Sequence, residues 1–216
     1  MGYDPPMPSA PTLLLFAGAA LALLVVPGPS VLYIVTRGMH QGRSAALVSV
    51  LGVTTATLVH TAFAAVGLSA ILASSAAAFT VVKVAGSAYL LWLAVRTWTD
   101  RSSERADAPP PAIPLRRIYL QGFVVNLLNP KTALFILALL PQFVDPARGS
   151  AAVQIVILGC VLASLGLLSD GAYALASGSI GGWLRRRRSV ATAQRRISAA
   201  VYALLGVGTA LAGQRG

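Results

Sequence analysis

Long apolar runs constrain this chain more than any other feature of its sequence. A helix needs about 20 apolar residues to cross a hydrocarbon core that is ~30 Å thick. Only 11% of the 216 residues are charged, whereas a soluble domain carries about a quarter. The runs predict an all-α integral membrane protein with six transmembrane helices, at about residues 12–36, 44–69, 76–98, 118–143, 151–177 and 197–213.

The positive charges predict how these helices are oriented. Thirteen of the 17 Lys and Arg residues, Arg37 among them, fall in the three loops after the first, third and fifth runs. The opposite side holds only Arg148 and Arg215, and Lys83 and Lys131 lie within runs. Because basic loops face the cytoplasm, we expect both termini outside. A five-span chain is the alternative, and it places some arginines on the wrong side.

A polar, proline-rich stretch at 99–117 is typical of a cytoplasmic linker. It divides the chain into two halves, 1–98 and 118–216, with three predicted spans in each. Since three is an odd number, corresponding spans of the two halves cross the membrane in opposite directions. Such inverted repeats are common in secondary transporters, where the substrate site lies between the repeats.

Two motifs interrupt the first and fourth runs: Pro27-Gly28-Pro29 and Asn129-Pro130-Lys131. A proline has no amide hydrogen and clashes with the preceding helical turn. We therefore expect the first helix to unwind near residues 24–29, exposing carbonyl groups that hydrocarbon cannot satisfy. Paired breaks in corresponding halves point to a transporter's binding site. A packing kink filled by neighbouring helices is the alternative.

Lys131 and Asp170 are ionisable groups placed inside the predicted spans. Lys131 falls near mid-membrane, where an ammonium costs at least ~2.5 kcal/mol, so it needs a carboxylate, carbonyl groups or a substrate carboxylate as partner. Asn126 lies on the same helical face as Asn129 and could bind the same ligand. Asp170 is read as a proton-coupling group or a site for a substrate ammonium, or else as an ion-pair partner of Lys131. We expect His60 to be a hydrogen-bonded structural residue.

Several classes of function have no support in this sequence. The lone Cys160 excludes an intramolecular disulfide and a cysteine-based metal cluster. A GxxxxGK[ST] loop is absent, as are HExxH and GxSxG, which disfavours ATP hydrolysis and intramembrane hydrolysis. We therefore expect neither an enzyme nor a cofactor. The net charge of +11 is explained by topology rather than by a nucleic-acid partner, and the run Arg185–Arg188 by membrane anchoring and lipid contact.

A set of motifs in one order covers nearly the whole chain: Pro27-Gly28-Pro29, Gly38 and Gly42, Lys83-x-x-Gly86-x-x-Tyr89-Leu90, Asn126-x-x-Asn129-Pro130-Lys131, and Leu140-Pro141-Gln142-Phe143. In this pattern the chain resembles the lysine exporter (LysE/RhtB, homoserine-threonine resistance) family of bacterial amino acid exporters. The resemblance implies a multi-pass protein of the bacterial plasma membrane. It also implies expulsion of amino acids or their analogues, driven by the proton motive force.

These observations predict a proton-coupled exporter of small amino acids, with amino acid, protons and membrane lipid as partners. Lys131 would hold the substrate carboxylate, exposed carbonyls the ammonium, and Asp170 the coupling proton. One intramembrane acid against two lysines favours a neutral zwitterion. The alternatives are an exporter of metal or other small cations and a non-transporting membrane subunit, and formation of a homo-oligomer stays open. The predicted substrate-binding residues are Pro27, Gly28, Pro29, Asn126, Asn129, Pro130 and Lys131.

Overall fold

The computed structural model describes residues 7–25, 27–74 and 112–186, with scattered positions between 80 and 99 and between 196 and 207. The predicted third and sixth spans, 76–98 and 197–213, therefore lie largely outside the described residues, as does most of the linker 99–117. Throughout the described part of the chain, every regular element is a helix. The prediction of an all-helical protein is confirmed for this part.

The described helices follow the same order in both halves, two short ones and then a long one. In the first half these are α1 (Ala10–Leu24), α2 (Pro29–Gln41) and α3 (Arg43–Ser74). In the second half they are α5 (Leu115–Leu127), α6 (Pro130–Leu139) and α7 (Ala151–Arg186). Two 3₁₀ helices, η2 (Leu140–Phe143) and η3 (Pro146–Arg148), lead from α6 to α7.

The long helices and the bent pairs account for the membrane-spanning length. Apolar segments of 26 residues in α3 and 27 residues in α7 are each long enough to cross a membrane. The pairs α1 with α2 and α5 with α6 reach that length together, and each pair is bent by 57° at its break. The structure thus has two to four candidate spans among its described residues, and the predicted breaks in the first and fourth runs are confirmed.

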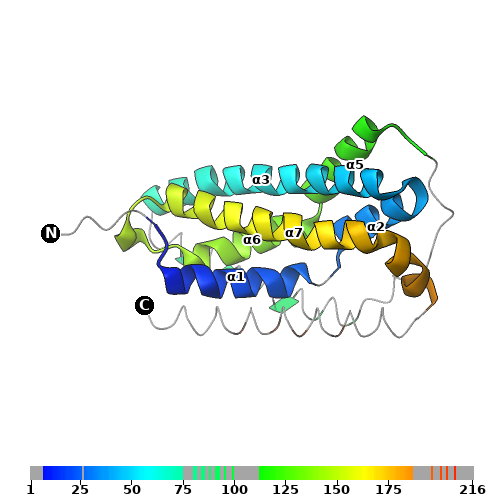
Figure 1. The fold of residues 1–216 in the computed structure, drawn as a ribbon. Coiled ribbons are helices and arrows are strands. Elements are labelled where there is room, and N and C mark those ends of the chain that lie inside the picture. The colour runs from blue at the N-terminus through cyan, green and yellow to red at the C-terminus, as the bar shows by residue number, and fades with distance from the viewer. Residues whose placement is uncertain are drawn as a thin grey trace.

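Corresponding helices of the two halves run in opposite directions (Figure 1). The chain passes through α1 and α2 one way along the bundle and through α5 and α6 the other way. The long helices α3 and α7 pack against each other and are also antiparallel. The end of α2 and the starts of α3 and α5 meet at one end of the bundle, which we call the basic end because it carries Arg43, Arg116 and Arg117.

The connection between α2 and α3 is shorter than predicted. Gly42 alone joins them, with a φ of +83° that favours glycine. Arg37, which the sequence placed in this loop, instead lies inside α2, and its side chain is only 6% exposed. The helix continues past the apolar run because Arg37 and Gln41 find hydrogen-bond acceptors. Arg37 donates to the Gln121 side chain of α5, and Gln41 donates to the Ile113 carbonyl just before α5.

A buried apolar cluster joins α1, α3, α6 and α7. Phe16 of α1 meets Phe143 of η2 edge-to-face, with ring centroids 5.3 Å apart. Glycines let helix backbones approach closely elsewhere in the bundle. A Cβ at Gly52 would collide with the Tyr119 carbonyl of α5, and one at Gly159 with the Thr61 side chain of α3.

Large apolar side chains on the outer face of the bundle are exposed. They include Leu14, Phe63 and Leu168, each about seven-tenths exposed or more. A soluble protein rarely exposes so many large apolar side chains, whereas lipid chains solvate them well. This outer surface is typical of a protein embedded in a bilayer.

Candidate functional site

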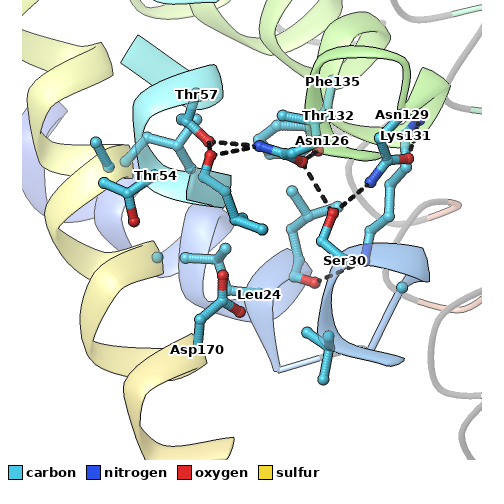
Figure 2. A pocket seen from close by; sticks show the side chains of 17 residues that line it. Leu24, Ser30, Thr54, Thr57, Asn126, Asn129, Lys131, Thr132, Phe135 and Asp170 are labelled. Atoms are coloured by element: carbon cyan, nitrogen blue, oxygen red, sulfur yellow. Dashed lines mark hydrogen bonds between the residues drawn. The ribbon is translucent and has the colours of Figure 1, made fainter. Parts of the chain in front are cut away.

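A pocket of about 60 Å³ lies where the two helix breaks meet. Its walls come from both halves, since residues of α1, α2 and α3 and residues of α5, α6 and α7 line it (Figure 2). Pro27 and Pro29 flank the glycine that lines it, and the side chain of Pro130 lies outside the described residues. The structure therefore brings together these predicted site residues around one cavity: Gly28, Asn126, Asn129, Lys131 and Asp170.

The prolines of the first break leave two carbonyl oxygens without their helical donors. In an α-helix each carbonyl accepts from the amide four residues later, and a proline has no such hydrogen. Pro27 removes the donor of Leu23, whose oxygen accepts a hydrogen bond from the Lys131 ammonium at 3.3 Å. Pro29 removes the donor of Val25, whose oxygen accepts from the Tyr173 hydroxyl at 2.9 Å.

At the second break, too, a side chain replaces the missing helical donor. Pro130 removes the helical donor of Asn126, whose carbonyl oxygen lies 3.3 Å from His60 Nε2. Because a carbonyl can only accept, Nε2 of His60 carries the hydrogen in this contact. The Asn129 amide also reaches this oxygen, at 3.1 Å. His60 is therefore a hydrogen-bonded structural residue, as predicted, and each break is repaired by a side chain from another helix.

The Asn126 side chain is only 2% exposed and uses its full hydrogen-bonding capacity inside the protein. Its Oδ1 accepts from the hydroxyls of Ser30 at 3.0 Å and Thr132 at 2.8 Å. Its Nδ2 donates to the Val53 carbonyl at 2.8 Å and to the Thr57 hydroxyl at 3.0 Å. One amide thus ties α5 to α2, α3 and α6, and it fixes the shape of the pocket at the breaks (Figure 2).

Asn129 holds the start of α6 in place. Its Oδ1 accepts from the Lys131 amide at 3.0 Å, which caps the helix. Its Nδ2 donates to the Ser30 hydroxyl at 3.1 Å. Since Ser30 also donates to Asn126, both asparagines of the second break are bonded to the first residue that follows the Pro-Gly-Pro motif.

Lys131 crosses from the second break to the first. A Cβ on Gly28 would lie 3.1 Å from the Cδ of Lys131, tighter than most carbon contacts in proteins. The absence of a side chain at Gly28 therefore makes room for the lysine stem. The ammonium reaches the pocket from one side, beside the Leu23 carbonyl (Figure 2).

Asp170 faces the same pocket from α7 and is only 6% exposed. Among the described residues, no group donates a hydrogen bond to its carboxylate. Lys131 is close enough to attract it electrostatically. The pocket thus has a cationic group on α6 and an anionic group on α7, with a largely apolar lining between them.

Comparison with known proteins identifies the class of molecule that carries this pocket. The profile of the LysE type translocators matches residues 21–214. The chain belongs to this family. Members of the family are transporters and not enzymes, and the apolar helices fit a multi-pass membrane protein. No solved structure matches the chain.

Several relatives of this translocator are named as efflux proteins. The homoserine/homoserine lactone efflux protein of Salmonella typhimurium is 29% identical over 163 residues, covering 76% of this chain and 79% of that protein. The threonine efflux protein of Escherichia coli K12 is 29% identical over 147 residues, covering 65% and 71%. The leucine efflux protein of Enterobacter sp. 638 is 27% identical over 144 residues, covering 66% and 68%.

The sequence did not single out the hydroxyl residues that this translocator gathers around its breaks. Thr54, Thr57 and Thr61 recur at three- and four-residue spacing along α3, which places them on one face of that helix. That spacing was a usable signal for a polar face inside the membrane. Ser30 and Tyr173 gave no comparable signal, because their partners lie 96 and 148 residues away.

A second polar cluster joins α2 to α5 nearer the basic end. Arg37 donates to Gln41 at 3.0 Å and to Gln121 at 2.9 Å, and its guanidinium lies 5.6 Å from the centre of the Tyr33 ring. Gln41 exchanges two hydrogen bonds with the backbone of Ile113, at 2.8 and 3.1 Å. We call these five residues the Arg37 network. It links the two halves near the basic end.

Proposed function

We propose that this translocator is a secondary active exporter of amino acids, small neutral ones or close analogues, driven by the proton motive force. The observation that carries the proposal is the pocket between the two broken helix pairs, with Lys131 and Asp170 facing it. A zwitterion presents one negative and one positive group, which complements this pair. The efflux relatives support amino acids over metal or other small cations.

The dimensions of the pocket favour a small substrate. A cavity of about 60 Å³ has room for roughly four to five water molecules. The carboxylate, ammonium and Cα of an amino acid fill a similar volume. The pocket therefore suits the head of a small amino acid.

The proposal includes a topology of six spans in two inverted repeats, residues 1–98 and 118–216, joined by the cytoplasmic linker 99–117. The opposite directions of α1–α3 and α5–α7 support it. Arg43, Arg116 and Arg117 gather at one end of the bundle, which supports a cytoplasmic basic end and external termini. An inverted pair of this kind places the substrate between the repeats, where the pocket lies.

The proposed site residues divide by role. Lys131 holds the substrate carboxylate, and Asp170 exchanges the coupling proton. The backbone around Pro27, Gly28 and Pro29 forms one wall, and Asn129 with Pro130 directs Lys131 into the cavity. Asn126 acts from the same cluster, through the hydroxyls and carbonyls that it holds in place.

Efflux from cells loaded with dipeptides tests the proposal. Cells that hydrolyse threonine-, homoserine- or leucine-containing dipeptides accumulate the amino acid unless an exporter removes it. We expect the wild type to lower the internal concentration and a protonophore to abolish this effect. Lys131→Ala and Asp170→Asn are expected to lose export, whereas Cys160→Ser, which changes an exposed side chain, is expected to keep it. Unchanged efflux in both site variants would refute the site assignment.

A further inference from the structure

We propose that Asp170 binds the ammonium group of the substrate directly, so that substrate and proton compete for one carboxylate. This inference rests on the proposed export function and deepens it. It assigns a ligand to the Asp170 carboxylate, to which no described residue donates a hydrogen bond. The chemical class of that ligand is a primary ammonium on a small zwitterion.

The carbonyls at the first break are already engaged. The oxygens of Leu23 and Val25, released by the two prolines, accept hydrogen bonds from Lys131 and Tyr173. An ammonium that relied on them would have to share them with these donors, since each oxygen can accept a second hydrogen bond. Asp170 requires no such sharing, because no described group donates a hydrogen bond to its carboxylate.

Burial makes the Asp170 carboxylate a strong acceptor. The side chain is 94% buried, since only 6% is exposed, and an ionised carboxylate removed from water needs donors or a counter-charge. An ammonium supplies both, through a charge-assisted hydrogen bond. The attraction of Lys131 reaches Asp170 across the pocket. A zwitterion between them would bring its ammonium to Asp170 and its carboxylate to Lys131.

The surroundings of Asp170 leave space for a ligand. Gly166 lies one helical turn earlier on α7, and a Cβ built there would meet only Leu24 Cδ2, at 3.8 Å, within 4 Å. On α3, Thr54 lines the same cavity and points into it (Figure 2). Its hydroxyl makes no hydrogen bond to the described residues. Both the glycine and the threonine therefore border open pocket rather than packed protein.

Competition follows from the charge of the carboxylate. A protonated Asp170 is neutral and loses its electrostatic attraction for an ammonium, whereas a bound ammonium stabilises the ionised form. Within the described bundle, Lys131 of α6 is the charged group facing it, and Tyr173 follows it on α7. On the neighbouring helices α3 and α2, His60 and Arg37 are bonded to other partners. Alternate occupation by substrate and proton is what an antiporter requires.

A binding comparison with the wild-type protein tests this without any substitution. Purified translocator in lipid nanodiscs would be titrated with leucine or threonine and with the matching α-hydroxy acid, which keeps the carboxylate and replaces the ammonium by a hydroxyl. We expect the amino acid to bind at least tenfold more tightly. We also expect its affinity to fall as the pH is lowered, because protonation removes the charge of the carboxylate. Equal binding of both compounds would overturn the inference.

Asp170→Asn provides the second arm. This isosteric change should abolish the preference for the amino acid over the α-hydroxy acid and flatten the pH dependence. Asp145→Asn is the matched control, because Asp145 is an exposed acid that only caps the following turn, and it should behave as the wild type. If the wild type binds neither compound and exports no amino acid, the proposed function fails. If it exports but Asp170→Asn keeps the preference, this inference alone fails.

Discussion

The ammonium of Lys131 donates a hydrogen bond to the carbonyl oxygen of Leu23, 108 residues earlier in the chain. The Leu23 carbonyl needs this donor because Pro27 has no amide hydrogen to donate to it. The lysine of the second break therefore completes the backbone of the first. A substrate carboxylate that binds Lys131 would bind an ammonium that this carbonyl already holds, which links occupation of the pocket to the geometry at the end of α1.

Loss of the Tyr173 hydroxyl should destabilise the first break. In Tyr173→Phe the Val25 carbonyl loses its 2.9 Å donor, and a typical hydrogen bond within a protein contributes about 0.5–1.5 kcal/mol. Thermal unfolding in detergent would show a lower midpoint. Tyr119→Phe is the control, since its partner Thr55 still donates to the Leu51 carbonyl and should be affected less. Equal shifts for the two variants would contradict the role given to Tyr173.

Two glycines of α3 should respond in opposite ways to alanine. Gly52→Ala forces a Cβ into the Tyr119 backbone, and overpacking of this kind costs about 1–3 kcal/mol. Gly67→Ala meets nothing within 4 Å and gains helix propensity, worth up to about 1 kcal/mol. Unfolding midpoints measured in the same detergent check the pair. A stable Gly52→Ala protein would show that α3 and α5 can separate at low cost.

The size of the exported side chain should depend on Gly166. In Gly166→Val the new side chain enters the pocket, so export of leucine should fall relative to alanine or threonine by roughly tenfold or more. Gly171→Val is the matched control on the same helix, because Gly171 also has open space around its Cα but does not line the cavity. Competition assays with mixed dipeptides measure the ratio. An unchanged export ratio in Gly166→Val would show that this part of the pocket wall does not determine which side chains are exported.

Weakening the Arg37 network should open the basic end. Gln121→Ala removes the acceptor that joins Arg37 to α5. A cysteine at Thr54, in a Cys160→Ser background, would report on access to the pocket. We expect it to react several-fold faster with a membrane-impermeant thiol reagent in inside-out vesicles once Gln121 is replaced. The control is the same cysteine with Gln121 intact, and equal rates would place the closure of the pocket elsewhere.

The breaks and the charged residues of the pocket were predictable from the sequence because their signals are local. Proline chemistry located the ends of α1 and α5, and the rarity of charge in apolar runs drew attention to Lys131 and Asp170. The hydrogen-bond partners were not predictable in this way. Ser30, Thr57 and Tyr173 acquire their roles only when helices distant in sequence are packed together.

Arg37 shows the converse limit. Because Arg37 follows an apolar run, the sequence predicted that it lies in a loop. In the structure, hydrogen bonds to Gln121 and to the Ile113 backbone allow its helix to continue. Hydropathy measures what a residue would prefer in isolation. The acceptor that α5 contributes, Gln121, reversed that preference, and it is 84 residues away in the sequence.

The single-residue link at Gly42 changes where this chain can flex. Its amide bonds to the Gly38 carbonyl, and its own carbonyl accepts from Ala46, so α2 and α3 are joined almost without slack. The Pro-Gly-Pro break, in contrast, interrupts the helical ladder between α1 and α2. Within the described residues, we therefore expect the chain to flex at the break beside the pocket rather than at Gly42, with α2 and α3 moving together.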